Sequence, residues 1–151
     1  MKDDIADQIN LDVLLCFATY SLSHAFSRFY RPMLEKLGLT YPQFIVMMVL
    51  WENGPTTMKA LGEKVVLDSN TLTPLLKKLE AAGLVTRQRN KDDERVLDVA
   101  PTAKAMTLKL DGKRAAMAIA ENSGETLEGV LEIQQRLTRM REKIKKADKA
   151  A

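Results

Sequence analysis

Apolar side chains recur at helical spacing through the first fifth of the chain. Between residues 8 and 31 they fall three or four positions apart, which places them on one face of an amphipathic helix. Pro32 lacks the amide hydrogen that a helix interior needs, so we expect this helix to end or kink there. A short helix from Met33 to Leu37 should follow and stop at Gly38, a favourable C-terminal cap. The members of the stripe are Leu11, Leu14, Leu15, Ala18, Leu22, Ala25, Phe26 and Phe29.

The next predicted helix is buried. Thr40 and Gln43 form a capping box, and Pro42 stands in the first turn, where proline is tolerated. The segment that follows, to about Glu52, is apolar nearly all round, which is typical of a helix inside a core. The Asn-Gly-Pro turn at 53–55 should end it.

Two helices joined by a tight turn are predicted next. Thr57 caps the first helix, which should end near Val65, and residues 66–68 connect it to a second helix from Ser69 to Ala82. A pair of helices with so short a connection is typical of a helix-turn-helix. Gly83 should end the second helix.

A strand–turn–strand unit follows. Residues 84–89 and 95–99 have the composition of two short strands, and the polar run 90–94 turns the chain between them. Pro101 should mark the exit, and Thr102 can cap the next helix.

From Ala103 to its end the chain is predicted to be helical, with a break at 122–124. The last helix has an apolar seam at near-heptad spacing, and a lone helix with such a seam needs a partner to cover it. We therefore predict one domain over 1–151, mainly α with a small two-stranded β-wing. Its winged helix-turn-helix part spans 40–100, and the helices of 1–36 and 103–151 serve dimerisation. The seam consists of Leu127, Val130, Leu131, Leu137, Met140 and Ile144.

The amino-acid composition says more about where the protein is found in the cell than about its function. With 46% hydrophobic and 28% charged residues among 151, the chain is globular, and its net charge of +3 is only mildly basic. A single cysteine rules out an intrachain disulfide and suits a reducing compartment. The N-terminus lacks a signal peptide, and no apolar run reaches the roughly 20 residues that span a bilayer. We expect a soluble, cytoplasmic protein without a membrane partner.

The second helix of the helix-turn-helix has the surface of a DNA-reading helix. Short polar side chains cluster at its start, although they are weak interior helix formers. Their polar ends suit base edges and phosphates, which the helix N-terminus also attracts. Alternatively, the two helices could be a plain hairpin in a core, and Pro74 is awkward for either role. The predicted DNA-contacting residues are Ser69, Asn70, Thr71, Thr73, Lys77 and Lys78.

The wing supplies cations beside that helix. Arg87, Arg89 and Lys91 could contact phosphates, which add affinity without sequence choice. Asp93 could hold Arg95 in position to enter the minor groove. The plainer alternative is an exposed Asp93–Arg95 ion pair of little energetic value.

A second stripe on the first helix has chemistry of its own. Cys16, Tyr20, Ser23, Ser27 and Tyr30 are separated by 4, 3, 4 and 3 positions, so they share a face. A lone cysteine is most often an inert small hydrophobe. Phenol donors would instead favour its reactive thiolate form. Two such helices crossing antiparallel near residue 23 would bring residue 16 of one opposite residue 30 of the other.

These features resemble a known family. Residues 40–100 look like the winged helix-turn-helix of MarR-type repressors, which carry a D-x-R wing, here Asp93 to Arg95. The resemblance implies a homodimer that binds a pseudo-palindromic operator. Within that family it resembles the peroxide-sensing branch, the organic hydroperoxide resistance regulators (OhrR). The motifs that carry this resemblance are Leu15-Cys16-Phe17 with Tyr20 and Tyr30, the Leu-Thr-Tyr-Pro-Gln run at 39–43, and residues 67–78.

The resemblance implies a mechanism. Cys16 would be the redox sensor, with Tyr20 and Tyr30 of the partner subunit bound to its thiolate. The reduced dimer would repress a peroxide-detoxification gene, and oxidation by an organic hydroperoxide would release the operator. Many members use a second cysteine, which this chain lacks. It resembles the one-cysteine type, in which the sulfenic acid at Cys16 either awaits an external low-molecular-weight thiol or is oxidised further to sulfinic and sulfonic acid. We predict a mixed disulfide as the reversible inactive state.

Two other functions can be weighed. A MarR-type repressor controlled by a small aromatic ligand would leave Cys16 incidental. A thiol peroxidase would need a resolving thiol and an oxyanion-stabilising site, and the sequence contains no pattern for either, so we expect no enzyme. The sequence also contains no cluster of metal ligands and no glycine-rich phosphate loop, so we expect no metal or cofactor. Tyr41 could line a sensor pocket or simply pack, and His24, eight positions from Cys16, is more typical of an interface residue than of a base.

Overall fold

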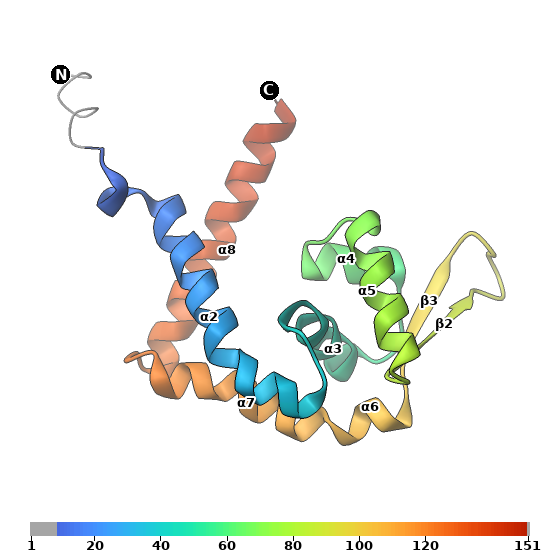
Figure 1. Cartoon of the computed structure of the whole chain (residues 1–151). Coiled ribbons are helices and arrows are strands. Elements are labelled where there is room, and N and C mark those ends of the chain that lie inside the picture. Colours follow the sequence, from blue (N-terminus) through green and yellow to red (C-terminus); the bar gives the residue numbers. More distant parts are fainter. Residues whose placement is uncertain (1–8, 151) are drawn as a thin grey trace. The chain divides into compact units, whose positions relative to one another are not determined.

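The computed structural model describes residues 9–150, with side chains from 9 to 149 (Figure 1). The described chain forms two compact units, the first ending at Lys113 and the second beginning at Arg114. Mainly helical architecture with a small sheet confirms the predicted fold class. The elements are η1 (Leu11–Val13), α2 (Leu15–Leu37), α3 (Tyr41–Asn53), β1 (Thr56–Thr57), α4 (Met58–Val65), α5 (Ser69–Ala81), β2 (Val85–Arg89), β3 (Leu97–Pro101), α6 (Ala103–Thr107), α7 (Lys109–Asn122) and α8 (Leu127–Ala150).

Helix α2 differs from the prediction at both ends. It begins at Leu15, after the separate 3-10 turn η1, and residues 1–8 of the predicted N-terminal segment lie outside the described residues. It also runs through Pro32 to Leu37, so the expected end at that proline was wrong, and the separate helix expected from Met33 to Leu37 is the last part of α2. The alternative expectation, a kink at Pro32, stays a prediction. Tyr30 and Leu34 are buried on either side of Pro32, and their packing offsets the one hydrogen bond that proline cannot donate. Gly38 caps the helix in the left-handed conformation, with φ 68°.

Helix α3 is the centre of the first unit. The predicted capping box is confirmed, because the Thr40 amide donates to Gln43 Oε1 at 2.8 Å and the Gln43 amide donates to Thr40 Oγ1 at 3.5 Å. Five of its side chains are buried, which confirms the predicted core helix. Burial on most sides explains why this helix shows so little amphipathic pattern. The buried side chains are Phe44, Val46, Met47, Leu50 and Trp51.

Helices α4 and α5 form the helix-turn-helix. Thr57 Oγ1 accepts from the Ala60 amide at 3.1 Å, which confirms the predicted cap of α4. The turn places Val66 in the left-handed region, with φ 58°, and Asp68 caps α5 by accepting from the Thr71 amide at 2.8 Å. Leu72, Leu76 and Leu79 bury one face of α5, leaving the opposite face to solvent. Pro74 is an exposed residue within α5.

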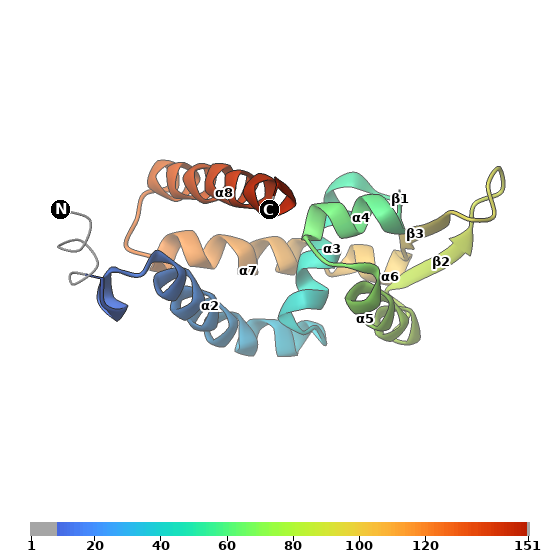
Figure 2. The same ribbon diagram turned by 90° about the horizontal axis from the view of Figure 1, so that it is seen from above.

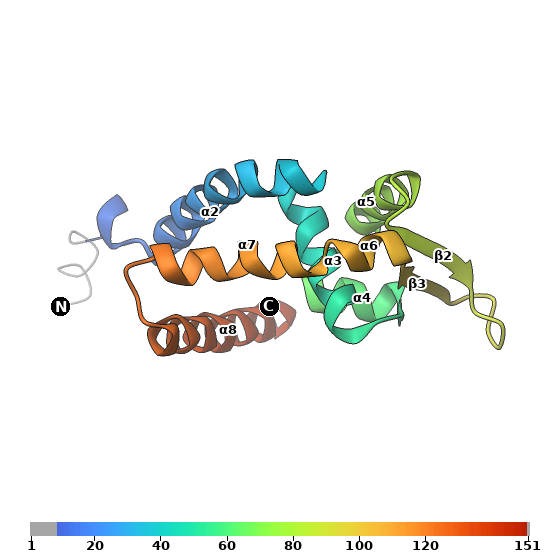
Figure 3. The same cartoon turned by 90° about the horizontal axis from the view of Figure 1, so that it is seen from below.

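The wing is a hairpin of β2 and β3, extended by a third strand. Strand β1 pairs with the other edge of β3, giving the antiparallel order β1-β3-β2. Strand β3 begins at Leu97 and includes Pro101, two residues later than the sequence predicts at each end. Arg95 and Val96 instead complete the turn, and Pro101 is tolerated because it ends its strand. Helix α5 lies beside β2, while α4 lies beside β3 (Figure 3).

The C-terminal part is helical, as predicted. Helix α7 ends at Asn122 and α8 begins at Leu127, so the expected break is confirmed. Within the described residues, no single helix is long and apolar enough to cross a membrane. The pair α2 and α3 meets the length and composition criteria together, although it bends by 68° between its two parts.

Candidate nucleic-acid interface and thiol site

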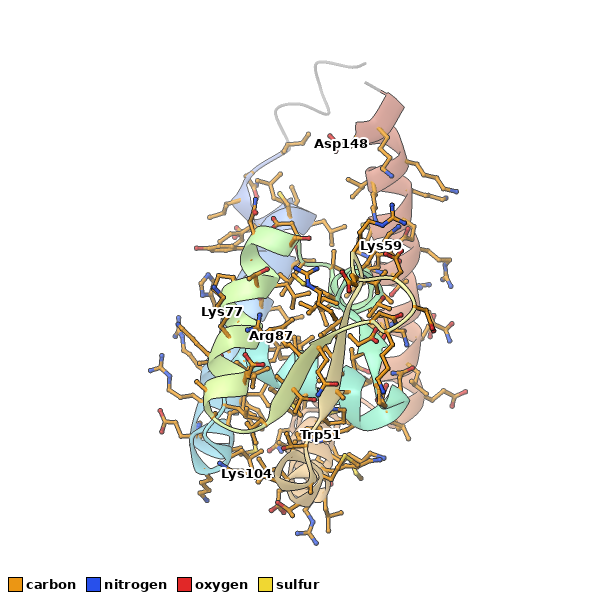
Figure 4. All side chains as sticks on the ribbon, turned by 90° about the vertical axis from the view of Figure 1, so that its right-hand side faces the viewer. Trp51, Lys59, Lys77, Arg87, Lys104 and Asp148 are labelled. Carbon is orange, nitrogen blue, oxygen red and sulfur yellow. The ribbon has the colours of Figure 1, made fainter. Side chains whose placement is uncertain are left out.

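The exposed face of α5 presents the polar residues that the sequence singled out. Ser69, Asn70 and Thr71 are exposed in its first turn, and Thr73 is half-buried one turn further along. Lys77 and Lys78 are exposed beyond them, and Lys77 extends outward from the helix in Figure 4. This arrangement can offer short hydrogen-bonding groups to base edges, with cations beside them for phosphates.

Asp68 lies directly before α5, and the sequence pattern was not interpreted as giving it a role at the start of that helix. Hydrogen bonds from Thr71 hold the pKa of the Asp68 carboxyl below its ordinary value. The carboxylate also complements the positive end of the helix dipole. Asp68 therefore fixes the start of α5, and with it the position of the three exposed polar side chains that follow. Its place directly before the helix was the signal that could have identified it.

The tip of the wing is ordered by hydrogen bonds between Asp93 and Arg95. Asp93 Oδ1 accepts from the Arg95 amide and from Nε, each at 3.0 Å, and Oδ2 accepts from Nη2 at 3.1 Å. These bonds lower the pKa of Asp93. The Arg95 side chain nevertheless stays 91% accessible, so the pair orients the guanidinium without covering it. The ion pair of the plainer interpretation is therefore present, whereas entry of the outward-facing arginine into a minor groove stays a prediction.

Arg87 has a different environment from the other wing cations. Its Nη2 donates to Glu80 Oε2 at 2.6 Å and its Nε at 3.1 Å, and only 19% of its side chain is accessible. This bond lowers the pKa of Glu80 and ties β2 to α5. The guanidinium of Arg87 is therefore paired with Glu80 inside the unit, whereas Arg89 and Lys91 are exposed.

The described chain keeps Cys16 apart from Tyr30. Cys16 is exposed as the second residue of α2, a helix that starts without a side-chain cap. Tyr20 lies one turn on, 62% exposed, with its ring edge-on to His24 at 4.5 Å between centroids. Tyr30 is 14 positions from Cys16, about 21 Å along a helix axis. A contact between that sulfur and Tyr30 within one chain is therefore excluded, and a contact across a dimer stays a prediction.

Tyr30 is instead the centre of an aromatic cluster. Its ring lies 5.4 Å from that of Tyr41, 5.5 Å from Phe44 and 6.0 Å from Phe29, between centroids. Burial, with a smaller contribution from Tyr41, raises the pKa of Tyr30 to about 12. At neutral pH its phenol is therefore protonated and able to donate a hydrogen bond. Tyr41, half-buried, packs in this cluster, and a role in a ligand pocket stays a prediction.

This raised pKa predicts lower stability at alkaline pH. The unfolded chain ionises Tyr30 near pH 10, whereas the folded chain retains the proton until about pH 12. The unfolded state then binds fewer protons, so the free energy of unfolding should fall as pH rises from about 10 to about 12. Urea unfolding across this range should show a steeper loss in wild type than in Tyr30→Phe. Equal slopes would contradict the assignment.

Three backbone carbonyls at the exit of α5 are held by the start of α6. Thr102 Oγ1 donates to Gly83 O at 2.6 Å, the Thr102 amide donates to Leu84 O at 3.0 Å, and Lys104 Nζ donates to Ala82 O at 2.8 Å. Thr102 also caps α6, as predicted. The predicted cap gave no indication of these longer-range bonds. They fix the end of the exposed helix relative to α6.

Comparisons with known proteins identify this architecture. The family profile for the transcriptional regulator SarA/Rot matches residues 28–111, more than half of the chain. The organic hydroperoxide resistance transcriptional regulator of Bacillus subtilis is 40% identical over 124 residues, covering 80% of this chain and 84% of that protein. The HTH-type transcriptional regulator TtmR of Methylorubrum extorquens is 42% identical over 140 residues, covering 91% and 71%.

Solved structures of similar proteins have the same architecture. Reduced AbfR bound to DNA has a TM-score of 0.77 and 30% identity, covering 95% of this chain and 96% of that one. AbfR, a protein of Staphylococcus epidermidis, has also been crystallised in an overoxidised form bound to DNA and in a disulfide form. Relatives of this kind are regulators and not enzymes. A winged helix-turn-helix on this scaffold, matched over most of its length, places the chain in the MarR/SarA family of DNA-binding transcriptional regulators.

Proposed function

We propose that this regulator is a one-cysteine sensor of organic hydroperoxides. The reduced homodimer represses a peroxide-detoxification gene by binding a pseudo-palindromic operator, and oxidation of Cys16 releases the DNA. The observation that carries the proposal is the exposed Cys16 on a helix that also bears Tyr20 and the buried phenol of Tyr30. The similarity to the organic hydroperoxide resistance regulator of Bacillus subtilis supports the class of oxidant.

Cys16 is exposed at the start of its helix. It lies in the first turn of α2, where backbone N–H groups point toward the helix start and no side chain caps them. In the dimer, Tyr20 and Tyr30 of the partner subunit donate their phenol hydrogens to the thiolate. These donors hold the sulfur in its reactive form and connect its chemical state to the α2 helices.

The oxidation proceeds in two balanced steps. The thiolate attacks the distal oxygen of the hydroperoxide, the O–O bond breaks, and the alkoxide leaves and takes up a proton as an alcohol, giving a sulfenic acid. A low-molecular-weight thiol then attacks that sulfur, forming a mixed disulfide and releasing water. Because Cys16 is the only cysteine of the chain, no second thiol of the same subunit can take the place of the small one.

Uncovered apolar residues support a homodimer. Large hydrophobic side chains on η1, α2, α7 and α8 are more than one third exposed in the isolated chain. Soluble proteins rarely leave such sets unburied without a partner surface. We propose that a second copy covers them. They are Leu11, Val13, Leu15, Phe17, Tyr20 and Leu22 in the N-terminal part, Leu110 and Met117 on α7, and Leu127, Leu131, Ile133, Leu137, Met140 and Ile144 on α8.

The dimer predicts a large effect of one charge on α8. Leu131 is 52% exposed in the single chain, so Leu131→Glu should be harmless to a monomer. If the partner covers it, the substitution buries a carboxylate and should shift the dimer toward monomers by roughly tenfold or more in dissociation constant. Analytical ultracentrifugation measures this shift. Gln135→Glu, on the same helix, adds the same charge at an exposed polar position as the control. Equal behaviour of the two variants would contradict the proposed interface.

DNA binding uses the exposed surface of α5 and the wing. We propose that Ser69, Asn70, Thr71 and Thr73 read the major groove, with Lys77 and Lys78 on phosphates. Arg89 and Lys91 add phosphate contacts, and Arg87 contributes through its bond to Glu80 by keeping β2 on α5. Arg95, held by Asp93, enters the minor groove.

Comparing three redox states of the protein tests the proposal. DNA selected by the reduced protein from a random library serves as the operator, at one fixed salt concentration because phosphate contacts make affinity salt-dependent. Reduced protein should bind tightly, and protein treated with cumene hydroperoxide and then a small thiol should bind roughly 10- to 100-fold more weakly. Mass spectrometry should find the thiol on Cys16.

Protein treated with excess hydroperoxide alone is the third state. Overoxidised AbfR was crystallised on DNA, so this state separates the effect of added charge from that of an attached thiol. Unchanged affinity in every state would contradict a redox function and leave the family assignment intact.

A further inference from the structure

Asn90 joins both strands of the wing to its tip. It follows β2 directly, and its backbone amide donates to Val96 O at 2.9 Å. Its side-chain Oδ1 accepts from the amides of Asp92 at 2.9 Å and Asp93 at 3.2 Å. Its Nδ2 donates to Asp98 Oδ2, on β3, at 2.8 Å. One half-buried carboxamide therefore uses both of its ends.

These bonds continue to the arginine that the wing presents. Asn90 holds the Asp93 amide, and the Asp93 carboxylate receives three hydrogen bonds from Arg95. Val96, next to Arg95, donates its amide to Asp93 O at 2.9 Å. Figure 2 shows this tip at the far end of the β2–β3 hairpin, beyond the helices of its unit. Without Asn90, the backbone amide of Asp93 would lose the hydrogen bond that it donates to Asn90 Oδ1, and with it a restraint on the direction of the Asp93 carboxylate.

We propose that Asn90 is a positioning residue for DNA recognition, acting through Asp93 on Arg95. The inference rests on the proposed entry of Arg95 into the minor groove. A 91% accessible arginine on a loose loop would sample many directions, and binding would have to order it. A tip preformed by the Asn90 bonds avoids that loss. The wing then distinguishes narrow, A·T-rich flanks from G·C-rich flanks, because a narrow minor groove attracts an inserted arginine.

The tip of the wing carries more acidic than basic side chains. Between β2 and β3 the tip contains three acidic side chains, Asp92, Asp93 and Glu94, and two cations, Lys91 and Arg95. In this acidic tip the Asp93 carboxylate orients Arg95, an arrangement that suits the placement of a single guanidinium.

A double-mutant cycle measured on two duplexes tests the proposal. The duplexes share the selected operator core and differ only in A·T or G·C flanks where the wings fall. Wild type should prefer the A·T flanks by roughly 5- to 10-fold. Arg95→Ala and Asn90→Ala should each abolish that preference, and the double variant should be no worse than Arg95→Ala alone. A loss from Asn90→Ala that is equal on both duplexes and persists without Arg95 would overturn the proposal.

An exchange of the two side chains provides a rescue that keeps net charge constant. In the pair Asn90→Asp with Asp98→Asn, residue 98 donates to residue 90, and a carboxylate oxygen still accepts the amides of Asp92 and Asp93. The flank preference should return in this pair. It should be absent in Asn90→Asp alone, which sets two carboxylates together. Asp98→Asn alone, which can keep the bond from Asn90, should retain the preference and serves as the charge control.

The outcomes separate this inference from the proposed function. A wild type and an Arg95→Ala variant with the same flank preference would disprove minor-groove entry by Arg95. Loss of the preference in Arg95→Ala but not in Asn90→Ala would overturn the role of Asn90 alone. If Asn90→Ala unfolds at the assay temperature, the exchanged pair decides: restored preference supports the proposal, and folded protein without preference overturns it.

Discussion

Replacing Cys16 with serine should leave a regulator that binds its operator like reduced wild type and stays bound after hydroperoxide treatment. Serine is nearly the same size as cysteine, and Cys16 is exposed in the single chain, so little packing is at stake. A serine hydroxyl has no comparable nucleophilicity toward the O–O bond and cannot form a mixed disulfide. Wild type should lose roughly 10- to 100-fold in affinity under the same treatment.

The measurement is operator affinity with and without cumene hydroperoxide plus a small thiol, on the duplex selected by the reduced protein. The serine variant also tests the alternative function. A regulator controlled by a small aromatic ligand would respond to its ligand equally with serine or cysteine at position 16. A Cys16→Ser protein that still releases DNA on oxidation would contradict the sensor role. Met106→Leu, a change at an exposed residue with another oxidisable sulfur, is the matched control and should respond like wild type.

Tyr20→Phe and Tyr30→Phe refine the same experiment. Each removes one phenol donor and leaves the ring, so the aromatic cluster around Tyr30 is preserved. Both variants should react more slowly with hydroperoxide, because the thiolate loses a donor that stabilises it. The rate of Cys16 modification, followed by mass spectrometry, measures this directly. Unchanged rates in both would contradict the proposed contact across the dimer.

Trp51→Ala should destabilise the protein more than any exposed substitution in the DNA-binding part. Trp51 is 2% exposed, and its Nε1 donates to Ala105 O at 2.9 Å, joining α3 to α6. Removing a buried indole costs about 3–5 kcal/mol through lost burial and the cavity left behind. Urea unfolding followed by circular dichroism measures the free energy of unfolding. Protein concentration must be held constant because a dimer unfolds with a concentration-dependent midpoint.

Trp51→Phe separates the hydrogen bond from the packing. Ala105 O also accepts from the Leu108 amide at 3.1 Å, so it keeps one partner when the indole is removed. We therefore expect a loss of only about 1–2 kcal/mol. A Trp51→Phe protein as unstable as Trp51→Ala would show that the hydrogen bond, and not the buried ring, carries the stabilisation.

Gly112 provides an independent test of the same packing. A Cβ at this position would overlap the six-membered ring of the Trp51 indole, so Gly112→Ala should also destabilise the wild type, by about 1–3 kcal/mol. The smaller ring of Trp51→Phe vacates part of that space. Gly112→Ala should therefore cost less in the Trp51→Phe background, and strict additivity would contradict direct contact between the two sites.

Trp51 also connects the two halves of the proposed mechanism. Its ring lies 6.4 Å from that of Phe44, which packs against Tyr30, and its hydrogen bond holds Ala105 in α6. The start of α6 in turn binds the backbone at the exit of α5. A change around Tyr30 thus has a continuous packed route to the exposed helix, and a variant that loosens Trp51 should weaken the response to oxidation as well as the fold.

Local patterns were sufficient for most of the helical architecture. The caps at Thr40, Thr57 and Thr102, the helix-turn-helix and the Asp93–Arg95 pair all depend on residues within a few positions of each other. Helical period, cap chemistry and turn composition are short-range properties, so a single sequence expresses them fully. The lone cysteine and its phenol-bearing helix face were visible for the same reason.

Contacts between distant segments decided the rest. Strand β1 is two residues long and exists only because β3 offers it an edge, and α2 passes Pro32 because Leu34 is buried beyond it. Three further contacts join residues whose spacing in the sequence gave no reason to expect them. They are the ion pair of Arg87 with Glu80, the aromatic cluster around Tyr30 and the hydrogen bond from Trp51 to Ala105. The sequence alone predicted most of the helices and singled out the side chains that we propose carry chemistry. The tertiary structure decided which of those side chains are buried, paired or presented, because burial and long-range hydrogen bonds exist only once the elements have packed.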